Sequence, residues 1–302
     1  MSPLRGRRLA VYVLLCAVWG STWLVIKIGL RDLPPLKFAA FRMSLACLLI
    51  APAALAARRT ISRREVVFVG ISGLLQIGLT YAFLFLATQW IASGLAAILF
   101  ASFPICVGLF AHFLLPEEPL TPRAVAAAAI GLCGVGIIEA PAAAGLLSSK
   151  SGHLAAGGAL VLGAAIASAY ANVLNKKSFS NVSPIVNVWG QTLVGSLFLL
   201  LAAGVFERGA PARWTPAAIL SVTYLALFGT VLTFAGLFWL IPKVPVAVIG
   251  TIPLVDTLIA VLLGGFILGE RLSARILAGG ALILAGVFLS ASRRRSPDVA
   301  AS

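Results

Sequence analysis

The chain consists of long apolar runs separated by short clusters of proline, glycine and charged residues. Each run stays apolar for about 20 residues, enough for a helix to cross a bilayer, and lacks the alternation of polar and apolar positions typical of barrel strands. We therefore predict an all-α integral membrane protein of ten transmembrane helices. The predicted spans are 9–30, 36–57, 66–88, 92–115, 122–140, 154–175, 184–206, 215–240, 244–268 and 274–291.

Composition and charge agree with this pattern. Of the 302 residues 61% are hydrophobic and only 11% are charged, whereas about a quarter of the residues of a soluble domain are charged. The net charge of +14 comes from basic residues in short loops between the runs, which indicates membrane topology and lipid contact and not nucleic-acid binding. An excess of basic residues in the segments on the same side of the membrane as the N-terminus predicts that both termini are cytoplasmic. We expect a multi-pass protein of the bacterial inner membrane. We expect the first run to be a retained span, because bulky Trp19 and Trp23 replace the small residues of a signal-peptide cleavage site.

The two halves of the chain resemble each other. A shift of 149 positions places Lys27 on Lys176, Pro35 on Pro184 and Arg42 on Gln191. A shift of 153 then places LTYAFLFLA (79–87) on LTFAGLFWL (232–240). Two copies of a unit with an odd number of spans must lie inverted in the membrane, which is typical of carriers that work by alternating access around a central cavity.

Three sequence motifs resemble those of the drug/metabolite transporter superfamily, specifically its EamA-like transporter family. They are WGSTW (19–23) with a lysine near the end of span one, PPLKFAAFR (34–42) in span two, and LGERLS (268–273) after span nine. The resemblance covers 9–291 and implies a ten-helix fold with a central cavity. It also implies a transport function, because members of the family export amino acids, other small metabolites or drugs. The implied organisation is a cytoplasmic N-terminus (1–8), repeat one (9–141), a linker (142–153), repeat two (154–291) and a basic tail (292–302).

The chain departs from the family pattern at two places. The first-half turn reads LPEEPLT (115–121), and Thr257 stands where a proline is expected, with Pro253 one turn earlier. Because proline lacks the backbone N–H of a regular helix, we expect span nine to kink near Pro253.

Three of the charged residues within or at the ends of the predicted spans are candidates for function. Asp256 is near the middle of span nine, where a carboxylate is costly unless it is paired, protonated or facing water. It is a candidate for proton coupling or for binding a substrate ammonium, and the alternative is a neutral acid that packs helices. Arg42 and Lys27 are candidates for binding a substrate carboxylate or balancing Asp256, and the alternative is that they reach to the interface.

Polar and aromatic side chains gather in a subset of the spans, as expected for a mostly apolar cavity with a few hydrogen-bonding groups. Any single Ser or Thr can instead be an interhelical contact, and spans five and ten, which are almost free of polar residues, are expected to support the fold or a homodimer contact. The predicted substrate-binding set, besides Arg42, is Trp19, Ser21, Thr22, Gln76, Tyr81, Tyr170, Asn172, Asn175 and Thr257.

Other function classes find little support in the sequence. His112 and His153 lie in different segments, the four cysteines stand alone, and no nucleophile elbow or phosphate loop is present. We expect no enzyme activity, no cofactor, no metal and no nucleic-acid partner, and we expect a small-molecule substrate and membrane lipid as partners. The favoured function is secondary export of amino acids or related metabolites. The alternatives are export of cationic or hydrophobic drugs and a lipid-handling membrane protein.

Overall fold

The structure is a computed structural model in which every described element of secondary structure is helical. It describes residues 4–57, 62–90, Ala96, 99–100, 102–117, 120–147, 152–178, 182–256, 258–259 and 274–291. The helices of the first half are α1 (Arg7–Gly29), α2 (Pro35–Ala56), α3 (Arg63–Gly73), the π-helix η1 (Leu74–Leu79), α4 (Thr80–Ala87), α6 (Phe103–Leu114) and α7 (Pro122–Leu147). The helices of the second half are α8 (Gly152–Ser178), α9 (Pro184–Phe206), α10 (Pro216–Ala226), the π-helix η2 (Leu227–Leu232), α11 (Thr233–Leu240), the 3₁₀ turn η3 (Ile241–Lys243), α12 (Val246–Gly250) and α14 (Ala274–Ala291).

Six helical stretches of the described chain are long and apolar enough to cross a bilayer. They are α1, α2, α3 through α4, residues 156–178 of α8, α9, and α10 through η3. Six of the predicted spans are thus confirmed as apolar helices of spanning length, and the chain is a multi-pass membrane protein. Shorter apolar helices cover parts of three other predicted spans, and α14 coincides with the last. Most of 257–273 lies outside the described residues, so the count of ten stays a prediction.

Local sequence accounts for where several helices begin. Proline is the first residue of α2, α7, α9 and α10, a position where its missing N–H costs nothing and its fixed φ suits the helix. The hydroxyls of Thr121 and Thr215 each accept a 3.2 Å hydrogen bond from the backbone N–H three residues on, which satisfies a donor at the helix start. The predicted linker 142–153 is in part helical, since α7 continues to Leu147 and α8 begins at Gly152.

The element boundaries follow the two shifts seen in the sequence. α2 and α9 begin 149 positions apart, at Pro35 and Pro184. The two π-helices begin 153 positions apart, at Leu74 and Leu227, and each separates two α-helices of the same lengths in both halves. Corresponding elements of the two halves therefore break regular helical geometry at the same place.

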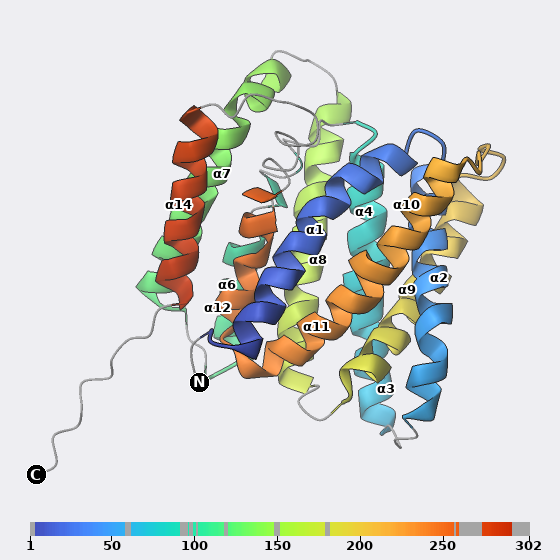
Figure 1. Cartoon of the computed structure of the whole chain (residues 1–302), viewed down its shortest axis with the longest axis horizontal. Coiled ribbons are helices and arrows are strands. Elements are labelled where there is room, and N and C mark those ends of the chain that lie inside the picture. The colour runs from blue at the N-terminus through green and yellow to red at the C-terminus, as the bar shows by residue number, and fades with distance from the viewer. Residues whose placement is uncertain are drawn as a thin grey trace, which may run out of the picture.

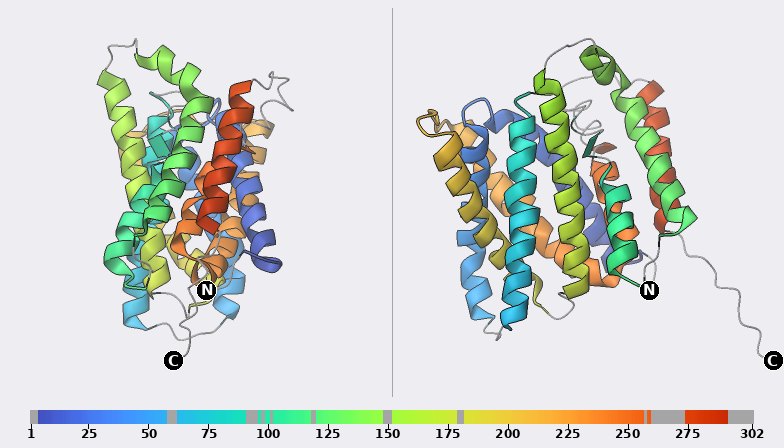
Figure 2. Two further views of the ribbon diagram at one scale, coloured as in Figure 1. Left: turned by 90° about the vertical axis from the view of Figure 1, so that its left-hand side faces the viewer. Right: turned by 180° about the vertical axis from the view of Figure 1, so that it is seen from behind.

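Corresponding helices also pack against each other in antiparallel pairs. Glu207, which follows α9, accepts 2.8 Å hydrogen bonds from the backbone N–H groups of Leu36 and Lys37 at the start of α2. Arg123 at the start of α7 donates a 2.9 Å hydrogen bond to the carbonyl of Leu289 near the end of α14. Figures 1 and 2 show the α7–α14 pair along one side of the bundle, whereas α2 and α9 lie at the opposite side.

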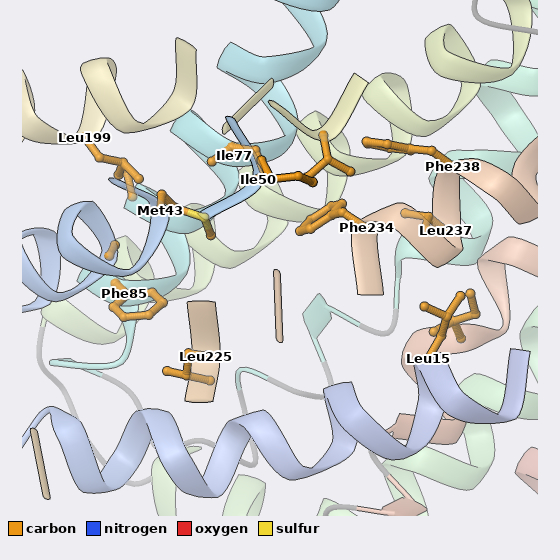
Figure 3. Close-up of a cluster of buried hydrophobic side chains, with 14 of the residues drawn as sticks. Leu15, Met43, Ile50, Ile77, Phe85, Leu199, Leu225, Phe234, Leu237 and Phe238 are labelled. Carbon is orange, nitrogen blue, oxygen red and sulfur yellow. The ribbon is translucent and has the colours of Figure 1, made fainter. Parts of the chain in front are cut away.

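The main apolar core lies among α1, α2, α4, α9, α10 and α11, around the two π-helices. Figure 3 shows Met43 and Ile50 from α2 next to Ile77 from η1, with Phe234, Leu237 and Phe238 projecting from α11. α1 begins and α14 ends at the same end of the bundle (Figure 1), which we call the N-terminal end; the opposite end is the far end. This core fixes how α1, α2, α4 and α11 surround the space described next.

Candidate functional site

A cavity lies between the helices of the two halves, with an empty volume of about 850 Å³ that includes the space open to its surroundings. We call it the central cavity. Its walls come from α1, α2, η1, α4, α6, α8, α11 and residues 249–256, and most of its lining is apolar or aromatic. The lining residues are Trp19, Thr22, Ile26, Arg42, Gln76, Thr80, Tyr81, Leu84, Phe85, Thr88, Phe100, Phe103, Ser168, Asn172, Phe234, Leu237, Ile249, Ile252, Pro253 and Asp256. An apolar space with a few polar groups suits a small amphipathic solute.

Arg42 is the largest fully buried side chain of the described chain, with 1% of its surface exposed. Its Nε donates to the hydroxyl of Thr230 at 3.0 Å and its Nη2 donates to the carbonyl of Gly229 at 2.8 Å. Its guanidinium carbon lies 4.8 Å from the centre of the Tyr81 ring, a cation–π contact. Helix α2 thus places a cation at the cavity wall, where residues of η2 and α4 contact it.

The π-helix η2 makes this contact possible. A π-helix departs from the regular pattern of hydrogen bonds between residues four apart, and the carbonyl of Gly229 within it accepts from both Arg42 and the indole of Trp19, the latter at 3.3 Å. A Cβ at Gly229 would lie 3.0 Å from the Arg42 Nη2 and 3.0 Å from the Thr22 methyl. Glycine therefore permits the close approach of the guanidinium to the backbone.

The Arg42 partners in the described chain are all neutral. A buried guanidinium without a carboxylate carries a large desolvation cost, which hydrogen bonds to a hydroxyl and a carbonyl offset only in part. None of the contacts of Arg42 within the described residues is an ion pair, and its Nη1 makes no hydrogen bond to them. The site is therefore electrostatically suited to an anionic group from outside the chain.

The other π-helix, η1, contributes a chain of amides to the same cavity. Gln76 donates to the Ser168 hydroxyl at 3.0 Å, and Asn172 donates to the Gln76 carbonyl oxygen at 2.9 Å. The Asn172 side chain is 2% exposed and its carbonyl oxygen Oδ1 has no hydrogen-bond partner among the described residues. A buried acceptor left unsatisfied costs free energy, so this oxygen is suited to a donor on a bound solute.

Asp256 also lines the central cavity and is 8% exposed. Helix α12 ends at Gly250, a turn at Thr251 follows, and residues 252–256 are helical again. Pro253 lies at the start of this second helical stretch, where its lack of an N–H is tolerated. The irregular backbone thus lies next to a carboxylate and is buried among the helices, as non-helical backbone at membrane depth must be.

Seven of the twelve predicted site residues line the central cavity: Trp19, Thr22, Arg42, Gln76, Tyr81, Asn172 and Asp256. Four others lie elsewhere. The hydroxyl of Ser21 is 2.6 Å from that of Tyr224, Tyr170 packs edge-on against Phe110 at 5.2 Å, Lys27 is exposed, and Asn175 belongs to a separate group of amides. Thr257 lies outside the described residues.

The predicted set omitted several cavity residues. Ser168 and Thr80 hold polar groups at the wall, and Phe85 and Phe234 form apolar parts of it. The repeat contained a usable signal for Ser168, because it corresponds to Trp19 under the shift of 149. Single phenylalanines in apolar helices carry no such signal, since those on the cavity and those in the core look alike in the sequence.

Comparison with known proteins identifies a matching family model and similar transporters. The sequence model of the EamA-like transporter family matches residues 8–139 and again 155–292. The chain is 28% identical over 285 residues to the uncharacterized transporter YoaV of Bacillus subtilis, covering 92% of this chain and 95% of the relative. It is 28% identical to the uncharacterized inner membrane transporter YedA of Escherichia coli K12, covering 98% and 93%.

A third relative carries a more specific name. It is described as a probable amino-acid metabolite efflux pump of Salmonella typhimurium and is 28% identical over 298 residues, 92% of each chain. A solved crystal structure superposes on 95% of this chain and 96% of its own with a TM-score of 0.79. At 21% identity this likeness shows a shared fold alone.

Proposed function

The chain belongs to the EamA-like transporter family, and from that premise we propose that it is a secondary transporter that exports amino acids or related small metabolites across the inner membrane. The observation that carries the choice of solute is Arg42, a buried guanidinium on the cavity wall whose described partners are all neutral. A carboxylate of the solute completes its set of partners through charge-assisted hydrogen bonds.

The remaining polar groups of the central cavity suit the other end of an amino acid. Asp256 and the unpartnered Oδ1 of Asn172 line the same cavity as Arg42, and both attract an ammonium group. The aromatic wall, including Trp19, Tyr81 and Phe234, accommodates an apolar side chain. A zwitterion with an apolar substituent thereby meets complementary groups throughout the cavity.

The two rival functions fit this cavity less well. A carrier of cationic drugs is favoured by Asp256 but disfavoured by a buried Arg42 on the same wall, since like charges repel. A lipid-handling protein needs a cavity that opens sideways between helices, whereas the polar groups here meet in the interior of the bundle.

Alternating access accounts for the paired halves. The two matches to the family model, the two π-helices at corresponding positions and the antiparallel pairs of corresponding helices support an inverted repeat. Rocking of the halves around the central cavity then exposes Arg42 to each side of the membrane in turn.

The direct test is uptake of a panel of labelled amino acids into proteoliposomes, with and without a proton gradient. We expect at least one amino acid to accumulate above protein-free vesicles, and Arg42→Gln to raise its KM. If the wild-type protein moves no member of the panel, the amino-acid assignment fails. If a cationic drug panel is transported instead and Arg42→Gln leaves it unaffected, the drug exporter is the better description.

A further inference from the structure

A second, smaller pocket lies near the N-terminal end of the bundle, where α8 and α11 end and α9 begins. Its empty volume is about 240 Å³, and its lining residues are Asn175, Val182, Asn187, Phe238, Ile241 and Pro242. We call it the amide pocket. Two buried amide side chains form its polar part, with Asn175 3% and Asn187 2% exposed.

A third amide, Gln191, completes a hydrogen-bonded group behind the pocket. Its Nε2 donates to the Oδ1 atoms of Asn175 and Asn187, each at 2.8 Å, and Asn187 Nδ2 donates to Asn175 Oδ1 at 3.0 Å. The Gln191 side chain is fully buried, and its Oε1 has no hydrogen-bond partner among the described residues. The group thus retains unused hydrogen-bonding capacity at a place where an unsatisfied polar atom is costly.

The internal repeat relates the amide pocket to the central cavity. Under the two shifts, Asn175, Phe238 and Ile241 correspond to Ile26, Phe85 and Thr88. Those three residues line the central cavity, and Ile26 and Thr88 lie near the ends of α1 and α4. Gln191 corresponds in the same way to Arg42. The amide pocket is therefore the counterpart, in the second half, of the part of the central cavity that reaches toward the far end.

Only a thin wall separates the two spaces. Leu237 lines the central cavity and the next residue, Phe238, lines the amide pocket. The Phe238 ring packs 5.7 Å from that of Phe234, which lines the central cavity. In this conformation the central cavity reaches toward the far end at Ile26 and Thr88, whereas its counterpart at the N-terminal end is a much smaller pocket, as an inverted pair predicts for a carrier that opens one side at a time.

We infer that Asn175, Asn187 and Gln191 form a second solute subsite, which opens to the N-terminal end when the halves exchange conformations and binds the polar head of the solute by neutral hydrogen bonds. This inference rests on the proposed alternating access. The exchange moves Phe238 away and joins the amide pocket to the central cavity. Because the amides add their hydrogen bonds only in the conformation that is open to the N-terminal end, the two faces of the carrier hold the same solute with different strength.

The first test measures transport from each face separately. Proteoliposomes are prepared with a variant that lacks the native cysteines and carries one introduced cysteine. An impermeant thiol reagent then inhibits the transporters whose introduced cysteine faces outward, so that only one orientation is measured. The probe is the amino acid of the panel that the wild-type protein transports. Asn187→Leu is expected to raise KM at the N-terminal face by about fivefold, which corresponds to the loss of one or two buried hydrogen bonds. At the far face we expect KM to change less than twofold.

A matched control lies on the same helix. Ser196 is buried, and its hydroxyl donates to the Leu193 carbonyl within α9, so Ser196→Ala is expected to change neither KM. If Asn187→Leu changes KM equally at both faces, the amides have a structural role and the subsite is wrong. Unchanged KM at the N-terminal face overturns it as well.

A second measurement needs no known solute and separates this inference from the proposed function. Cysteines introduced as Ile241→Cys and Thr88→Cys are labelled with an impermeant maleimide from either face. We expect labelling of Ile241→Cys from the N-terminal face only and of Thr88→Cys from the far face only. If Ile241→Cys is never labelled, no vestibule opens and the inference fails even if transport is found. If labelling occurs as expected but no amino acid moves, the proposed class of solute fails and the vestibule stands.

Discussion

At the scale of single residues, the chemistry of the central cavity concentrates on one guanidinium and one carboxylate in an apolar wall. Arg42 is held by neutral partners from η2 and α4, so a carboxylate from solution adds a charge-assisted interaction that the chain itself does not provide. Asp256 lies on the same cavity next to the helix break at Thr251. Each can be tested by a substitution that removes the charge and keeps a polar side chain.

Replacing Arg42 by Gln removes the charge and keeps a hydrogen-bonding side chain like that of its counterpart Gln191. We expect KM for a transported amino acid to rise roughly 10- to 100-fold, the range for loss of a hydrogen bond to a charged group. Arg208 is exposed and serves as the control, so Arg208→Gln is expected to leave KM unchanged. An unchanged KM in Arg42→Gln removes Arg42 from the site.

Asp256→Asn separates proton coupling from solute binding. If the carboxyl group carries the coupling proton, the variant loses accumulation driven by a proton gradient but retains exchange of labelled for unlabelled solute, because exchange needs no net proton movement. The measurement compares gradient-driven uptake with exchange in the same vesicles. Gradient-driven uptake at the wild-type level in Asp256→Asn contradicts the coupling role.

At the scale of elements, two interruptions and two close pairs organise the bundle. The π-helix η1 places Gln76 at the wall of the central cavity, η2 directs the Gly229 carbonyl toward Arg42, and these two positions correspond under the shift of 153. The antiparallel pairs α2–α9 and α7–α14 bring corresponding helices into contact. The α7–α14 pair depends on glycines that allow the two backbones to approach.

Gly134 and Gly136 on α7 provide a matched test of that close approach. A Cβ at Gly134 would lie 2.5 Å from the carbonyl oxygen of Gly279 on α14, whereas a Cβ at Gly136 meets nothing within 4 Å. We expect Gly134→Ala to destabilise the protein by about 1–3 kcal/mol, the usual cost of overpacking, and Gly136→Ala to be neutral or slightly stabilising. Thermal unfolding in detergent checks this, and equal melting temperatures for the two variants contradict the contact.

At the scale of the whole molecule, the directions of the helices place several pairs of basic residues at one end of the bundle. Arg7 and Arg8 begin α1, Arg63 and Arg64 begin α3, and Lys176 and Lys177 lie in the last turn of α8, all at the N-terminal end. The excess of positive charge at this end favours a cytoplasmic location for it. Orientation in the membrane follows from this asymmetry as a prediction.

Single cysteines at opposite ends test that orientation. In a background without native cysteines, Arg208→Cys is expected to react with an impermeant maleimide in intact cells, and Arg64→Cys only after the cells are opened. Both positions carry exposed basic side chains, so the two variants control for each other. The reverse labelling pattern would place the N-terminal end outside and contradict the cytoplasmic assignment.

Much of this architecture follows from sequence alone, because the signals behind it are local or periodic. Continuous apolar runs produced six spans that the structure confirms, since the backbone in a bilayer must satisfy its own hydrogen bonds within a helix. The repeat of Pro35, Arg42 and residues 79–87 predicted a helix start at Pro184 that corresponds to the one at Pro35, and the structure adds that the two π-helices correspond under the shift of 153. A buried arginine in an apolar run was recognisable as a candidate, because burying charge is costly.

Only the tertiary structure decided which polar residues share a cavity. Trp19 and Ser21 are two positions apart, yet Trp19 lines the central cavity and Ser21 pairs with Tyr224 on another face of α1. Asn172 and Asn175 look alike in the sequence, but they belong to different pockets, because Asn172 contacts Gln76 of η1 and Asn175 contacts Gln191 of α9. Such contacts join residues far apart in the chain through helix packing, which no local pattern encodes, whereas spans and repeats arise from the hydrophobicity of neighbouring residues.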